Sequence, residues 1–141
     1  MKYSAAVIDT NVVVAGLLTG TVDSPTAEII DGMCNGMFPF LLSTALVAEY
    51  RHVLLRRKMR ALHGLNEREV DILLTTLAAN AIVREPEPRT GAPDAGDDHL
   101  WSLVQSEPNR VLVTGDRALA QNPPRMGSVL APRQFIDSLR A

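Results

Sequence analysis

Five short runs of mostly apolar residues recur along the chain, at residues 5–8, 38–42, 81–83, 111–113 and 128–130. Runs of this length that are bounded by polar or turn-forming residues predict strands. The run at 5–8 is apolar throughout, as in a strand that is buried on both faces of a parallel sheet. The same burial is expected of residues 111–113.

Helical patterns fill the segments between the strands, at residues 12–18, 25–36, 45–63, 66–79, 97–107 and 132–139. The first of these contains three valines and so also has strand propensity, but the polar and glycine residues around it favour a short helix. Ser24 and Pro25 predict a helix start, as do Asn66 and Glu69. Strands that alternate with helices predict an α/β fold in which helices cover a parallel sheet. The 141 residues fit one domain, 1–141.

Acidic residues lie just after the predicted strands or near the start of the helices that follow them. Asp9 ends the first strand, and Glu49 lies in the helix after the second. Asp98 opens the helix after the third strand with Asp97 beside it, and Asp116 follows the fourth. The carboxyl ends of parallel strands share one edge of a sheet. We therefore expect these carboxylates to converge in space.

Converging carboxylates repel one another, so an ionised cluster of this kind requires cations. Oxygen ligands select hard cations, which predicts Mg²⁺ or Mn²⁺. A pair of such ions cleaves phosphodiesters, one by activating water and the other by stabilising the departing oxygen. Taken singly, Glu49 and Asp98 are explained as well by favourable contact with a helix dipole, and Asp116 by a turn. An acid that closes a buried strand, as Asp9 does, has no such ready alternative.

The overall composition changes this picture little. A net charge of −2 argues against a uniformly basic, nonspecific nucleic-acid binder. The single cysteine, Cys34, excludes a disulfide framework and a cysteine-based zinc site. The short N-terminal apolar run is interrupted by Asp9, Thr10 and Asn11, so it predicts neither a signal peptide nor a membrane span. We expect a cytoplasmic protein.

Local basicity is nevertheless present on the predicted helix that carries Glu49, at Arg51, His52, Arg56, Arg57, Lys58 and Arg60. These residues form either a solvated helix face or a strip that binds a phosphate backbone beside the acids. Arg117, next to Asp116, is a further candidate for such binding. The three histidines, His52, His63 and His99, lack the spacing of metal ligands and are expected at the surface.

Four segments together resemble the PIN-domain family of metal-dependent ribonucleases: residues 7–11 (VIDTN), 48–50 (AEY), 94–101 (DAGDDHLW) and 111–116 (VLVTGD). The resemblance spans essentially the whole chain and is greatest to the bacterial subgroup regarded as toxins of toxin–antitoxin pairs. It implies a Rossmann-like three-layer sandwich with a central parallel sheet of four or five strands and an acidic pocket for Mg²⁺ or Mn²⁺.

The resemblance also assigns roles to individual residues. It implies that Asp9, Glu49, Asp98 and Asp116 are the catalytic acids and metal ligands, with Asp97 as an adjacent alternative for the third. Supporting polar positions are matched by Thr10, Asn11 and Thr114. The implied reaction is endonucleolytic hydrolysis of RNA that leaves 5′-phosphate and 3′-hydroxyl ends.

The expected partners are the RNA substrate and a cognate antitoxin that inserts Arg or Lys among the acids. We also expect a homodimer through the helices at 24–37 and 66–79. A phosphatase with an Asp nucleophile is one rival, but Asn11 stands where such enzymes need a second Asp. A catalytically degenerate PIN-like module that binds RNA or protein is the other.

Overall fold

The strands of the computed structural model, which describes residues 2–140, pair in parallel throughout. Three of them form a sheet in the order β1 (Ala5–Ile8), β4 (Arg110–Val113), β5 (Ser128–Leu130). The other two, β2 (Leu41–Leu42) and β3 (Ile82–Val83), pair with each other. A bridge between Ala6 and Phe40 joins this pair to β1. The predicted parallel α/β architecture is confirmed, with β2 and β3 shorter than their apolar runs.

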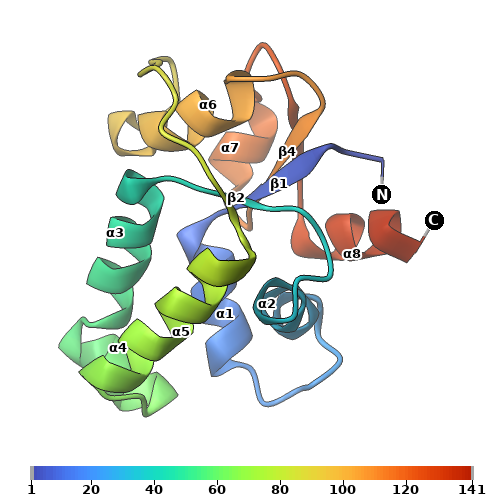
Figure 1. Cartoon of the computed structure of the whole chain (residues 1–141). Helices are drawn as coiled ribbons and strands as arrows, with labels where there is room; N and C mark the ends of the chain where they lie inside the picture. Colours follow the sequence, from blue (N-terminus) through green and yellow to red (C-terminus); the bar gives the residue numbers. More distant parts are fainter. Residues whose placement is uncertain (1, 141) are drawn as a thin grey trace.

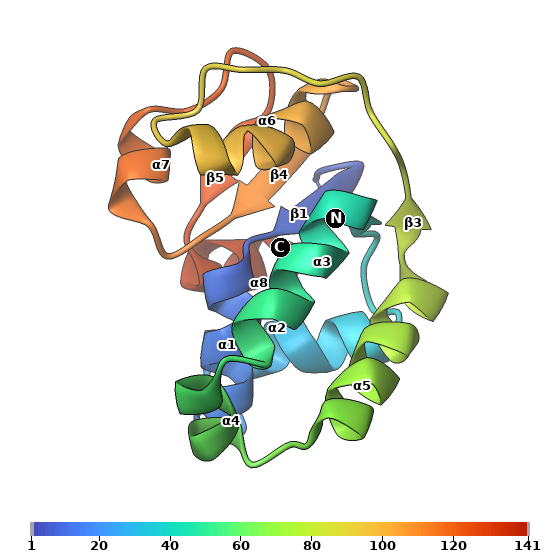
Figure 2. The same ribbon diagram turned by 90° about the vertical axis from the view of Figure 1, so that its left-hand side faces the viewer.

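The helices cover both faces of these strands (Figures 1 and 2). In chain order they are α1 (Thr10–Leu18), α2 (Pro25–Cys34), α3 (Thr44–Leu54), α4 (Arg57–His63), α5 (Glu67–Asn80), α6 (Asp98–Gln105), α7 (Arg117–Gln121) and α8 (Pro132–Arg140). A 3₁₀ turn, η1 (Ala95–Asp97), leads into α6. Figure 2 shows α6 on one face of the strands and α2 and α8 on the other. Over residues 2–140, no helix has the length and apolar character that crossing a bilayer requires.

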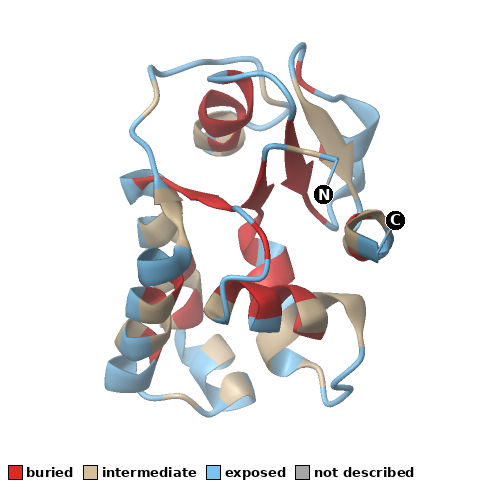
Figure 3. Ribbon diagram, turned by 45° about the vertical axis from the view of Figure 1, so that its right-hand side comes forward, coloured by how far each residue is buried: buried red, intermediate tan, exposed pale blue. Residues whose placement is uncertain are grey.

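The core is built on β1 and β4, whose residues are all buried (Figure 3). Burial of each large apolar side chain contributes about 1.5–3 kcal/mol, so these strands form a stable platform. Tyr50 of α3 is also fully buried, and its hydroxyl donates a hydrogen bond to the carbonyl oxygen of Ile8. This bond ties the middle of α3 to the last residue of β1, and so places Glu49 near the sheet edge.

The helix starts follow the sequence signals. Ser24 accepts a hydrogen bond from the Ala27 N–H, with Pro25 as the first residue of α2. Asn66 and Glu69 form a capping box at the start of α5, each side chain accepting from the backbone N–H of the other. Such caps stabilise a helix start by about 1 kcal/mol. They explain why these two boundaries were predictable from residue types alone.

The predicted helix at 45–63 is wrong in one respect, because the chain forms two helices there. The backbone turns at Leu55 and Arg56, between α3 and α4. The His63 side chain stabilises this break: Nε2 lies 2.8 Å from the Leu54 carbonyl oxygen, and Nδ1 accepts from the Leu65 N–H at 2.9 Å. His63 is therefore a structural residue. Of the basic residues, Arg57, Lys58 and Arg60 lie on α4 and Arg56 is its N-cap, whereas Arg51 and His52 lie on α3 with Glu49.

Candidate active site

A cavity of about 480 Å³ opens where β1 and β4 end and where α1 and α7 begin. Acidic side chains line one end of it and apolar side chains the other. Its lining residues are Asp9, Thr10, Asn11, Val14, Ala15, Leu18, Val53, Met59, Asp97 and Asp116. The fold therefore brings three carboxylates that are distant in the sequence to one opening, at the edge where a parallel sheet is expected to bind ligands.

Asp9 is held rigidly at the centre of the acidic end. Its Oδ1 accepts from the Thr10 N–H at 2.8 Å, so Asp9 also caps α1. Its Oδ2 accepts from the Thr114 hydroxyl at 2.7 Å and from the Asn11 amide at 3.3 Å. The parallel pairing of Ile8 with Val113 places Thr114 beside Asp9. The three predicted supporting residues thus all contact this carboxylate. Asn11 and Thr114 do so through their side chains, and Thr10 does so through its backbone N–H.

Asp116 is joined to Asp9 through Thr114. The Thr114 hydroxyl donates to Asp9 and accepts from the Asp116 N–H at 3.0 Å. The Asp116 carboxylate accepts from the Ala118 N–H at 2.8 Å and caps α7. The sequence pattern does not predict α7, which has only five residues. Its N-terminus nevertheless supplies the N–H that holds the Asp116 carboxylate in place.

Glu49 adjoins the cavity from α3. Its Oε2 accepts a hydrogen bond from the Thr10 hydroxyl, and its Oε1 lies 3.6 Å from Nε2 of His99. The His99 ring and then the Thr10 hydroxyl lower the pKa of Glu49, against the effect of burial. The same pairing raises the pKa of His99. The expectation that His99 is a surface residue is therefore wrong: it is half-buried and contacts a candidate catalytic acid.

The structure places Asp97, rather than Asp98, among these acids. Asp97 occupies the N-cap position of α6 but makes no capping hydrogen bond, and its side chain lines the cavity. Asp98 instead accepts from the Ala92 N–H at 3.1 Å and lines a separate cavity of about 280 Å³. A free N-cap carboxylate is unusual, because capping normally satisfies a backbone donor. The adjacent alternative from the sequence is thus the residue that converges with Asp9 and Asp116.

Mutual repulsion among the acids appears in their pKa values. Burial raises the pKa of Asp97 to about 6, with further contributions from Asp9, Glu49 and Asp94. Burial also raises the pKa of Asp9, and Glu49 and Asp116 add to the rise, although hydrogen bonds from Thr114 and Thr10 oppose it. A cation bound between Asp9 and Asp97 would relieve the repulsion that contributes to these raised pKa values.

A hard divalent cation fits the donor chemistry of this pocket, which offers carboxylate and hydroxyl oxygens. Within residues 2–140, no group of three or more His, Cys, Asp or Glu side chains is arranged so that it could hold a metal ion as it stands. Mg²⁺ is commonly bound through one or two carboxylates, with water and substrate phosphate completing its shell. Asp9 and Asp97 are the pair that best meets this requirement, because the first is rigidly held and the second has no competing capping bond.

One predicted RNA-binding residue has a different role. Arg51 pairs with Asp71 at 2.9 Å and with Glu67 at 2.7 Å, which fastens α3 to α5. Its guanidinium is thus engaged within the protein and does not belong to a free basic strip. The remaining candidates are all exposed, namely Arg56, Arg57, Lys58 and Arg117.

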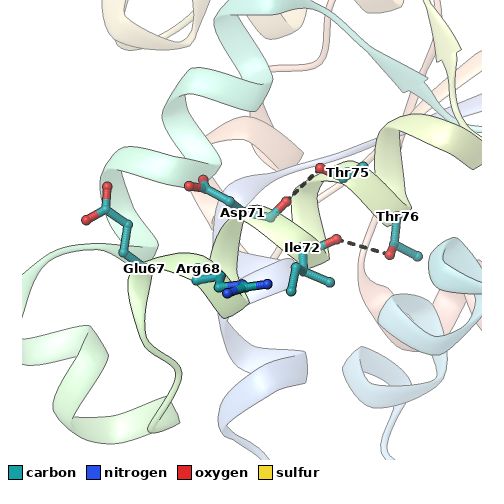
Figure 4. Close-up of a pocket in the computed structure, with 6 residues that line it drawn as sticks. All are labelled: Glu67, Arg68, Asp71, Ile72, Thr75 and Thr76. Atoms are coloured by element: carbon teal, nitrogen blue, oxygen red, sulfur yellow. Dashed lines mark hydrogen bonds between the residues drawn. The ribbon is translucent and has the colours of Figure 1, made fainter.

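A larger hollow, of about 610 Å³, lies on the outer side of α5 (Figure 4). Its acidic residues, Glu67 and Asp71, are those paired with Arg51. The hydroxyls of Thr75 and Thr76 donate to carbonyl oxygens one turn earlier in the same helix, at 2.8 and 3.1 Å. Because its acids and hydroxyls already have partners, this hollow is a weaker candidate for chemistry than the acidic cavity.

A family model described as PIN domain matches residues 5–118 of the chain. The chain belongs to the PIN-domain family. The matched segment runs from β1 into α7 and includes every acid of the cavity. No match to a curated protein accompanies it. The match confirms the resemblance seen in the sequence at the level of family and fold. PIN domains are generally nucleases and typically use divalent metal ions.

The raised pKa of Asp97 gives a test of the acidic cluster in metal-free protein. Its folded-state pKa of about 6 lies above the ordinary value of 3.8, so the folded state binds more protons between these values. The stabilisation that protonated Asp97 gives the folded state is complete below about pH 4 and is lost as the pH rises through 6. Asp97→Asn should therefore become increasingly more stable than wild type from pH 4 to pH 7, as measured by urea unfolding with a chelator present.

Asp98→Asn is the matched control, since its side-chain oxygen can still accept from Ala92 and it lies outside the cavity. Its stability relative to wild type should not follow the same pH curve. A pH-independent difference for Asp97→Asn, or equal curves for the two variants, would contradict the proposed cluster.

Proposed function

We propose that this PIN-domain protein is an Mg²⁺- or Mn²⁺-dependent endoribonuclease. The observation that carries the proposal is the convergence of Asp9, Asp97 and Asp116 on one cavity, with Glu49 adjoining it. Burial and neighbouring acids raise the pKa of Asp9 and of Asp97, so keeping these two carboxylates ionised costs the folded protein stability. Such perturbed groups in a cavity are typical of functional sites.

The chain's own residues would divide the work as follows. Thr114 and Asn11 fix the orientation of Asp9, and the Thr10 hydroxyl fixes Glu49. Asp97, which has no capping bond, is free to turn toward a ligand. A divalent ion bound among these acids would supply charge for the phosphate oxygens and favour deprotonation of water. The N–H groups at the starts of α1 and α7 hold the Asp9 and Asp116 carboxylates in place.

RNA contact beside the acids is assigned to exposed arginine and lysine residues. Arg56 stands at the start of α4 and acts electrostatically on Glu49, lowering its pKa. Arg57 and Lys58 follow it on α4, and Arg117 follows Asp116 on α7. These cations would flank the acidic cavity and bind phosphates that the carboxylates themselves repel.

Substitution of single acids should separate the catalytic set from its neighbour. Asp9→Asn keeps an oxygen that can cap α1 but loses the charge, so RNA cleavage should fall by roughly 10²–10⁴-fold while the fold is retained. Asp97→Asn should lose activity similarly. Asp98→Asn should retain it. Cleavage of a labelled RNA with Mn²⁺ and with a chelator, together with circular dichroism, measures both properties.

The opposite ranking, with Asp98→Asn inactive and Asp97→Asn active, would restore Asp98 as the third acid. Full cleavage by a folded Asp9→Asn variant would instead remove Asp9 from the catalytic proposal, and absence of cleavage by the folded wild type with Mn²⁺ would favour the degenerate binding module.

Charge reversal on α4 tests the RNA surface. Arg56→Glu with Arg57→Glu should weaken RNA binding and make its salt dependence shallower, by about 0.7 in the logarithmic slope for each lost contact with a single strand. Stabilisation by Mn²⁺ should persist. Arg68→Glu with Arg133→Glu makes the same charge change at exposed positions of α5 and α8, and its slope should match wild type. Equal slopes for both double variants would show that α4 is only a solvated face.

We further propose a toxin role in the cytoplasm, with an antitoxin that blocks the cavity. An uninhibited ribonuclease attacks the transcripts of its own cell, and an arginine or lysine of a partner would pair well with Asp9, Asp97 and Asp116. A homodimer is part of the same proposal. Exposed apolar residues support an interface along α2 and α5: Met37 is 75% exposed just after α2, and Ile72 is 57% exposed on α5.

Expression in a bacterial host should therefore arrest growth for the wild type and not for Asp9→Asn at equal protein level. Co-expression of the product of a small neighbouring gene should restore growth and yield a complex, detected by co-purification and by mass in solution. Harmless expression of a cleavage-competent wild type would reject the toxin role and leave the nuclease.

A further inference from the structure

Away from the acids the cavity is lined by apolar residues, of which Val14 also packs against the hydrophobic core. Asn11, Val14, Ala15 and Leu18 follow one another at helical spacing, so they form one stripe along α1. A helix at the surface normally presents polar residues on its open face. In this stripe Leu18 remains 38% exposed. The buried valines of α1, Val12 and Val13, lie outside the stripe.

The facing wall of this apolar end comes from α3 and α4, through Val53 and Met59. Both side chains are only partly buried. Helix α4 has no buried residue at all, so Met59 is not there to fill the core. Methionine side chains are flexible and adapt to ligands of varied shape. We call the surface formed by Val14, Ala15, Leu18, Val53 and Met59 the apolar trough.

We propose that the apolar trough receives one unstacked nucleobase of the RNA whose phosphate lies at Asp9, Asp97 and Asp116. This inference rests on the proposed function and deepens it, because it names the residues that contact the substrate beyond the scissile phosphate. The two ends share one continuous cavity. The stripe from Asn11 to Leu18 extends roughly 10 Å at 1.5 Å per residue, which is long enough to accommodate a ring system beside a phosphate.

The chemistry of the trough favours a base over other occupants. Bases present flat apolar faces that apolar side chains can cover, and this contact tolerates any sequence. Arg56 lies in the chain between the two wall residues, Val53 and Met59, and is exposed. A cation beside an apolar surface complements a nucleotide, which joins a base to an anion. Because the trough's side chains offer no hydrogen-bond donor, it would accept bases by shape rather than by their polar edges.

A base can enter the trough only after leaving its stack. RNA loops, bulges and ends provide such bases, whereas a regular duplex holds them in place. The trough therefore favours unpaired segments and disfavours cleavage within duplex RNA, with weak preference among the four bases.

Abasic substitution provides the test. A short labelled RNA with one mapped cleavage site is prepared in versions that lack a single base on either side of that site. One position should show a loss of roughly five- to fiftyfold in kcat/KM for the wild type, because apolar contact with that base is removed. Met59→Ser and Leu18→Ser should show a similar loss on the intact RNA. On the abasic RNA they should lose little more, since the contact is already absent.

Binding provides a second readout that needs no turnover. Affinity for the same oligonucleotides is measured by fluorescence anisotropy with Ca²⁺ in place of Mn²⁺. The control, Ile72→Ser, changes an exposed apolar residue of α5 away from the cavity, and it should respond to base removal as the wild type does.

The outcomes distinguish the trough from the nuclease. Indifference of the wild type to base removal at every position, in both cleavage and binding, would overturn the trough; an apolar side chain of a protein partner is the occupant that this result would favour. Base removal that affects the wild type, Met59→Ser and Leu18→Ser equally would overturn the trough as well. Base-dependent binding that is lost in these variants, without any RNA cleavage, would support the trough and reject the proposed function.

Discussion

Like charges are held together at one sheet edge by donors that the fold supplies, and the candidate site depends on this balance. The Thr114 hydroxyl and the Thr10 N–H both bond Asp9, and the Ala118 N–H bonds Asp116. The two bonds to Asp9 favour its charged form and oppose the cost of its burial. The donors come from helix starts and from the end of β4, so parallel pairing of β1 with β4 is the condition for the whole arrangement.

Much of the fold follows from residue types that act locally. Apolar runs gave β1 and β4, and the caps at Ser24 and Asn66 gave the starts of α2 and α5, because burial and capping are decided within a few residues. The break between α3 and α4 was not predictable in this way. It depends on His63 reaching back to the Leu54 carbonyl, a contact between residues nine positions apart that no helical pattern records.

The choice between Asp97 and Asp98 shows a similar limit for the site. Both are acids at the start of one helix, and the distance to the Thr-Gly-Asp segment favoured Asp98 by a register of one residue. The difference arises in the 3₁₀ turn before α6, where Asp94 accepts from the Gly96 N–H and sets the phase of the next residues. Asp98 is then turned toward Ala92. The partner of Glu49, His99, was missed for the same reason, although it lies within the same helical turn.

The acids therefore differ in whether they also cap a helix. Asp9 and Asp116 serve the fold as helix caps and the cavity as charges, so a change to alanine would confound the two roles. Asp97 serves no capping role. Its raised pKa indicates that its charge costs stability, and no capping hydrogen bond at the start of α6 offsets that cost. That asymmetry makes Asp97 the position where stability and function are most clearly opposed, as expected of residues selected for activity rather than for folding.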